Sequence, residues 1–238
     1  MGVRLQNDSI SLNGGRYRVS IIDLEYSGSV ELFNMTKVLF KSTGDAKDMI
    51  KPVSMGALDL SLWIDNAAVE AFVSDVEEAE ESRFYVKVER NDGGFYSTEF
   101  TGMILTDSIG YDDSQYALLQ LNAVDGLGFL KDVEFEWGST DYYYPMWKIL
   151  HTALVKNPIV TNLYGDSDIV MVCQSNIQMN INDFESIFLN LGHINYYFDI
   201  KGEIRTNWTC YEVIEEILKK YTPYQQVERI LSMWMNFF

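Results

Sequence analysis

A glycine-rich segment behind a predicted strand is the first feature that could do chemistry. Residues 120–132, QLNAVDGLGFLKD, place two glycines and a lysine after an alternating apolar run, which is how phosphate-binding loops follow a strand. Dinucleotide loops need three glycines as G-x-G-x-x-G within a strand–helix–strand unit. Here Lys131 takes the place of the third glycine, Asp125 would face the phosphate, and the neighbouring strands are predicted to be antiparallel. The segment therefore does not predict a nucleotide site.

A structural interpretation suits the same residues better. Asp125 follows the end of a predicted strand and can cap a short helical turn. Gly126 and Gly128 allow a close approach of the backbone. The apolar side chains of this segment are predicted to plug a core, and they are Leu127, Phe129 and Leu130.

Acid–base, nucleophilic and metal chemistry have no motif to support them. His151 and His193 are far apart in the chain and have no nucleophile motif or H-E-x-x-H spacing beside them. Cys173 on a predicted strand and Cys210 on a predicted helix lack metal-ligand spacing, and both are expected to be small buried apolar groups. The acidic turns do not follow the calcium-loop spacing. The sequence thus predicts no catalytic residue, no cofactor and no metal, and so not an enzyme.

The aromatic residues leave two interpretations open. Tyr143, Tyr144 and Trp147 lie close together in the sequence YYYPMW. Aromatic faces can stack on sugar rings, so this cluster could serve a carbohydrate-binding module. Tyrosine, tryptophan and methionine are also enriched in subunit interfaces, and the core or interface interpretation is the more frequent one for such clusters.

The formal net charge of -17 excludes other classes of function. Binding to nucleic acid is driven by lysine and arginine, and here 35 acidic residues outnumber 18 basic ones. No apolar run reaches the roughly 18–20 residues that a membrane-spanning helix needs, and the first residues do not form a signal peptide. We therefore expect a protein made in a cytoplasm, with no sequence-specific binding to nucleic acid and no membrane span.

The first half of the chain has the alternation of half-buried strands. The predicted strands are residues 16–26, 57–65, 83–90, 95–107 and 116–124. NDGG at 91–94 predicts a hairpin turn between two of them, and the stretch that follows residue 65 predicts a helical insert.

After Asp132 the pattern changes to helices with short strands between them. Helices are predicted at 145–156, at 181–193 and at 209–223, the last with a capping box made by Thr209 and Glu212, and residues 159–175 predict strands. The fold class is thus α+β, with an antiparallel, barrel-like module over 1–135 and a mixed module over 136–238. The chain stops on Phe237 and Phe238, so we expect its end to be docked or cut within a domain.

The order of features over residues 100–135 resembles that of a known family. The segment runs from a strand with F-x-G through an acidic turn to an alternating strand and then A-x-D-G-L-x-x-L-K. This order is similar to the first barrel of phage tail tip and baseplate hub proteins, of the type carried by phages and prophages of Bacteroidetes. The matching positions are Phe100, Gly102, Asp107, Ala123, Asp125, Gly126, Leu127, Leu130 and Lys131. The likeness is looser over 15–156, and the chain is short for a complete hub.

The resemblance implies a structural protein of the virion. Its copies would form a closed ring of three- or six-fold symmetry, which adapts the tail tube to the host-recognition apparatus alongside other tail proteins and assembles in the bacterial host cytoplasm. An acidic tube lumen would repel DNA passing through it. The positions expected to build the module or its interfaces are Phe100, Gly102, Asp125, Gly126, Leu127, Phe129, Leu130, Tyr143, Tyr144 and Trp147. The alternative is a monomeric carbohydrate-binding module that uses the aromatic cluster.

Overall fold

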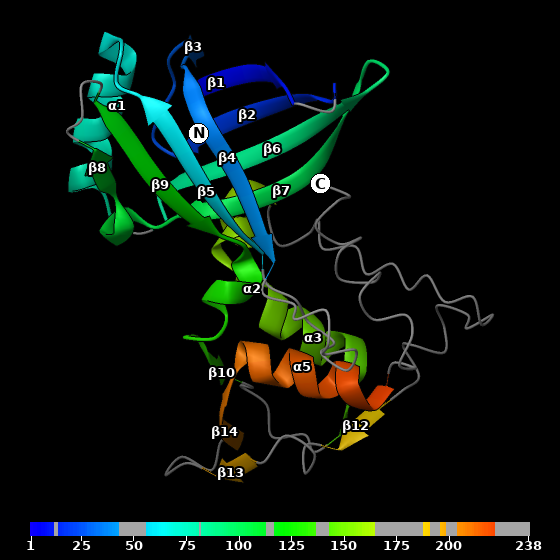
Figure 1. Ribbon diagram of the computed structural model, residues 1–238. Helices are drawn as coiled ribbons and strands as arrows, with labels where there is room; N and C mark the ends of the chain where they lie inside the picture. Colours follow the sequence, from blue (N-terminus) through cyan, green and yellow to red (C-terminus); the bar gives the residue numbers. More distant parts are fainter. Residues whose placement is uncertain are drawn as a thin grey trace. The chain divides into compact units, whose positions relative to one another are not determined.

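The computed structural model divides the chain into two compact units (Figure 1). The described residues are 1–11, 14–42, 56–80, 82–112, 117–136, 143–164, 188–190, 196–198 and 204–221. Those up to Asp125 belong to the first unit and those from Gly126 onward to the second. The sequence predicts a boundary after residue 135. The boundary between the two compact units follows Asp125.

In its described residues the first unit is a nine-stranded sheet with one α-helix and a short 3-10 turn at Thr106–Ser108. Its strands are β1 (Gly2–Ile10), β2 (Arg16–Asp23), β3 (Glu31–Leu32), β4 (Met35–Ser42), β5 (Gly56–Trp63), β6 (Phe84–Asp92), β7 (Phe95–Ile104), β8 (Gly110–Asp112) and β9 (Leu118–Val124). Their order is β3-β1-β2-β6-β7-β9-β5-β4, with β8 also paired to β9. All pairs are antiparallel except β1 with β3.

Local sequence explains the centre of this sheet. Along β5 the leucines at 58, 60 and 62 are buried and alternate with half-buried residues, as the period of two predicts. At the turn between β6 and β7, Gly93 and Gly94 adopt positive φ, and Gly94 donates its N–H to the side chain of Asn91. The predicted hairpin is therefore confirmed, and only glycine adopts such φ values without strain.

Helix α1 (Ala67–Glu78) covers the core of the sheet. It begins at Asn66, whose side chain accepts the N–H of Val69 as an N-cap. Its buried side chains join the core cluster of the strands, and the ring of Phe72 meets that of Phe84 edge-on at 5.3 Å. The predicted helical insert is thus confirmed.

The α+β class is confirmed, but the prediction of a barrel-like module holds only as far as an antiparallel sheet. The sheet is open, because no pairing joins β4 to β1 among the described strands. The segment from β3 to β4 starts on β1, where Phe33 donates its N–H to Gln6, and then crosses to pair with β5. Past that crossing, β1 and β4 each keep an edge to which no described strand pairs.

The described part of the second unit contains short strands and helices, of which α3 and α5 are the two longest helices. Its elements are α2 (Gly126–Phe129), β10 (Glu134–Glu136), β11 (Tyr143–Pro145), α3 (Met146–Leu154), a π-helical turn (Val160–Tyr164), β12 (Phe188–Asn190), β13 (Tyr196–Phe198), β14 (Ile204–Thr209) and α5 (Cys210–Tyr221). Helices α3 and α5 pack together. At the start of α5, Thr209 donates its N–H to the carboxylate of Glu212, and Glu212 donates its N–H to the hydroxyl of Thr209, so the predicted capping box is confirmed.

Two predictions for this unit are wrong where the structure describes them. Residues 160–164 form a helical turn instead of a strand, because Asn157 accepts the N–H groups of Ile159 and Thr161 and starts a turn. Residues 188–190 form a strand paired with β11 instead of a helix. No helix within the described ranges is both long and apolar enough to span a membrane.

Candidate interaction site

Phe100 and Gly102, the two predicted positions on β7, pack against each other in the first unit. Phe100 is fully buried, and its ring meets that of Phe40 on β4 edge-on, with 5.6 Å between the ring centroids. A Cβ atom placed on Gly102 would lie 2.5 Å from the ring of Phe100 and 2.9 Å from the carbonyl oxygen of Val124. Glycine is therefore required here by close packing.

Asp125 holds two strands of the same unit together. Its carboxylate is buried and accepts the N–H of Gly56 at the start of β5. Its own N–H donates to the carbonyl of Gly56 at 2.9 Å. This reciprocal pair ties the end of β9 to the beginning of β5, which is a structural role for the aspartate of the D-G-L sequence.

The rest of the D-G-L segment belongs to the second unit, not to the core cluster of the sheet. Leu127 and Leu130 are buried there and Phe129 is half-buried. A Cβ on Gly126 would fall within about 2 Å of the side chain of Asn157, so this glycine also permits a close approach. Lys131, the position that a phosphate loop would fill with glycine, lies 5.1 Å from the ring centroid of Tyr211.

The aromatic cluster is described only in its backbone. Tyr143 and Tyr144 lie on β11 and pair with Asn190 and Leu189 on β12. Trp147 lies in the first turn of α3. The side chains of these three residues, and hence a sugar-stacking platform, lie outside what the structure describes.

A groove lies between β1 and β4 of the first unit, and we call it the seam groove. It encloses about 1000 Å³. Its walls are residues 7–10 of β1 on one side and, on the other, Asn34 with residues 35–38 and Phe40 of β4. Its floor is made of inward-facing side chains of the neighbouring strands, namely Val19, Leu58, Val88 and Phe100.

The seam groove combines an apolar interior with a polar rim. Phe40 lines it and is 54% exposed although its ring contacts Phe100. At the closed end, Asn7 donates its amide to the carbonyl of Phe33 at 2.7 Å. The other end of that amide, Oδ1 of Asn7, is buried and accepts no hydrogen bond from any residue that the structure describes. A buried acceptor without a donor costs free energy, and because this oxygen is buried it is not open to an incoming chain.

The groove rim also carries an exposed cation. Lys37 lies on β4 and makes no ion pair with any residue that the structure describes. On the opposite wall, Asp8 is bound by Arg18 at 2.8 Å. The next lysine of β4, Lys41, is bound by Asp59. Lys37 is therefore a rim cation that can still form an ion pair with a carboxylate of a binding partner.

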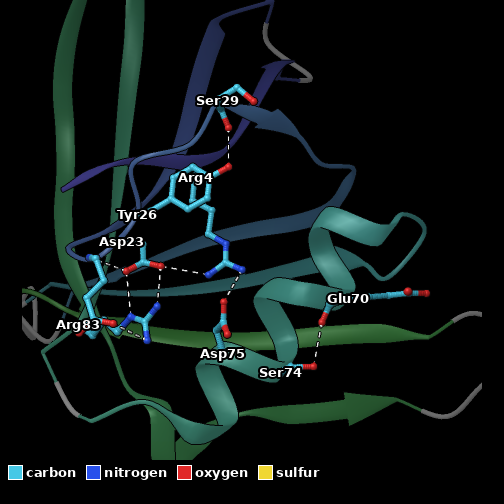
Figure 2. Close-up of polar contacts among 9 residues, drawn as sticks. Arg4, Asp23, Tyr26, Ser29, Glu70, Ser74, Asp75 and Arg83 are labelled. Carbon is cyan, nitrogen blue, oxygen red and sulfur yellow. Dashed lines mark hydrogen bonds and ion pairs between the residues drawn. The ribbon is translucent and has the colours of Figure 1, made fainter.

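A buried ion network fixes β1 and thereby one wall of the groove (Figure 2). Asp23 on β2 is 1% exposed and binds both Arg4 of β1, at 3.1 Å, and Arg83, at 2.9 Å. Arg4 is 7% exposed and also binds Asp75 of α1 at 2.6 Å. The network joins β1, β2, the start of β6 and helix α1. Buried charges of this kind are tolerated because each is paired and hydrogen-bonded.

Three described side chains with shifted pKa values are Asp23, Cys210 and Tyr111, and burial or hydrogen bonds within the fold explain each shift. Burial raises the pKa of Asp23, but hydrogen bonds from Arg83, from the N–H of Glu25 and from Arg4 outweigh it, so this pKa is lowered. Burial raises the pKa of Cys210 to about 11, and burial with a hydrogen bond to Glu77 raises that of Tyr111 to about 12. No group of three metal-binding side chains occurs in the described part of the chain.

Sequence analysis missed the seam groove. The strands β1 and β4 were not predicted, so Asn7, Lys37 and Phe40 were not considered as site residues. The alternation in MTKVLFKS at 35–42 was a signal that could have identified β4. A comparison of the chain with protein-family models finds no match, and a comparison with curated proteins finds none either.

Proposed function

We propose that this chain is a structural subunit of a phage tail tip or baseplate hub. Its copies form a closed homo-oligomeric ring that adapts the tail tube to the host-recognition apparatus, in contact with other tail proteins. It is assembled in the bacterial host cytoplasm and is not an enzyme. The proposal comes from the resemblance over residues 100–135, and the open sheet of the first unit is the observation that supports it most.

An open sheet leaves main-chain groups and apolar side chains for another chain to cover. Here the uncovered part is the seam groove, where β4 presents Phe40 as an exposed apolar residue. Exposed apolar groups next to an unpaired edge strand are typical of surfaces that bind protein. The first unit therefore has a surface suited to assembly.

The residues behind the resemblance also support a structural role. The ring of Phe100 leaves no room for a side chain at Gly102, and Asp125 accepts a hydrogen bond from the N–H of Gly56. Packing or hydrogen bonding thus explains the residue type at both positions. These residues specify a framework, which fits a repeated building block better than a ligand site.

The charge of the chain suits the same role. A tube that conducts DNA works best when its inner surface repels the polyanion, and the chain carries a formal charge of -17. The adaptor therefore needs no nucleic-acid contact of its own.

Electron microscopy of the purified full chain tests this proposal. A ring of uniform size with three- or six-fold symmetry is the expected result. A parallel titration with glycans, followed by tryptophan fluorescence, tests the carbohydrate-binding alternative. Particles of single-copy size whose fluorescence changes with a glycan would overturn the ring and favour that alternative.

A further inference from the structure

Among the described residues of the first unit, the most exposed large apolar side chain lies at the tip of the β6–β7 hairpin. Phe95 follows the Gly93–Gly94 turn directly and is 83% exposed. Tyr96 beside it is partly exposed, and its ring lies 4.0 Å from the guanidinium of Arg18. Figure 1 shows this hairpin extending beyond the neighbouring strands. A large aromatic side chain held out on a rigid turn is the kind of group that anchors a protein interface.

The hairpin tip lies at the end of the sheet where the seam groove has its Ile10 wall. The strand register connects the two, because Ile10 pairs with Arg16, Arg16 with Asn91, and Asn91 with Tyr96. Ile10 is 69% exposed and lines the groove. A protein that approaches this end of the sheet therefore meets both a projecting aromatic group and an apolar hollow.

We propose that the seam groove of one copy takes up the β6–β7 hairpin tip of a second copy. The inference rests on the self-association in the proposed function and names the contact. Phe95 of the incoming tip covers the exposed face of Phe40 and the apolar floor.

Charge favours a second copy of this chain as the occupant. The groove rim offers the ammonium group of Lys37, which has no ion-pair partner among the described residues. The incoming tip carries Asp92, whose side chain is 53% exposed although Arg90 binds it. Tip and groove are different surfaces, and a contact between different surfaces can repeat around a ring.

A disulfide between two variants tests the contact directly. One variant carries Phe95→Cys at the tip and the other Thr36→Cys on the groove wall, both with Cys173→Ser. The remaining cysteine, Cys210, is buried and has a raised pKa, so it should not compete. On mixing under mild oxidation we expect a linked pair of copies that neither variant forms alone in comparable yield.

Substitutions at each side of the contact give the matched measurement. Phe95→Ser and Lys37→Glu should each weaken self-association, the former by about tenfold or more because a central aromatic anchor is lost. Leu32→Ser is the control, since Leu32 is 72% exposed but does not line the groove. Circular dichroism verifies that all three variants fold.

The outcomes separate this inference from the proposed function. A ring that forms without the 36–95 disulfide, and that Phe95→Ser leaves intact, overturns the inference alone. A disulfide-linked pair that stays a dimer at every concentration supports the contact and contradicts the ring. A chain that stays monomeric and forms no disulfide overturns both.

Discussion

Removing the charge of Asp23 should strongly destabilise the first unit. In Asp23→Asn the shape is kept, but the guanidinium groups of Arg4 and Arg83 face a neutral amide. Asp23 is 1% exposed and Arg4 is 7% exposed, so little water can replace the lost carboxylate. Removing one member of a buried ion pair typically costs about 3–5 kcal/mol, a large part of the roughly 5–15 kcal/mol that stabilise a domain.

Urea denaturation measures this cost. Trp63 on β5 reports on the sheet by its fluorescence, and the variant should unfold at a clearly lower urea concentration than the original chain. Asp92→Asn is the matched control, because Asp92 binds Arg90 on the exposed hairpin and its loss should leave the midpoint unchanged. Equal midpoints for Asp23→Asn and the original chain would refute the role given to the network.

The pH dependence of the same difference has a definite sign. The pKa of Asp23 is lowered in the folded chain from its ordinary 3.8. Its contribution to stability is therefore present above that ordinary value and is lost as the pH falls through the lowered pKa. The two chains should differ most near neutral pH and converge in acid, whereas a difference that grows on acidification would contradict the cause given for the shift.

Three further changes test other parts of the fold. Thr209→Ala removes the capping box with Glu212 and should cost about 1 kcal/mol, measured by thermal denaturation of the helical signal. Gly102→Ala should cost about 1–3 kcal/mol by overpacking, while Gly110→Ala, where a Cβ meets only ordinary contacts, should unfold at nearly the same urea concentration as the original chain. Cys210 should react with a maleimide far more slowly in the folded chain than in urea, because it is buried with a pKa of about 11; equal rates would contradict its burial.

Patterns that local sequence controls were predictable. The leucines of β5, the N-D-G-G turn and the capping box of α5 each depend on residues within a few positions of one another. β1 was missed because Arg4 and Leu5 are buried in succession and the register shifts between Val3 and Leu5. An irregularity of this kind hides the alternation by which a strand is identified.

The interaction site depends on pairings that sequence alone does not reveal. The groove exists because the segment from β3 to β4 leaves β1 after Phe33 and joins β5. The ion network brings Arg83 to Asp23 across 60 positions of sequence. The strands predicted over 160–164 failed because Asn157 organises a helical turn that overrides the preference of β-branched residues.

The mass of the native full chain over a series of concentrations is the most direct test of the central claim. Native mass spectrometry with light scattering on the same samples gives the number of copies. We predict one discrete closed species, of three or six copies, that persists on dilution over a wide range. A single copy at every concentration would contradict the ring and the structural role that depends on it.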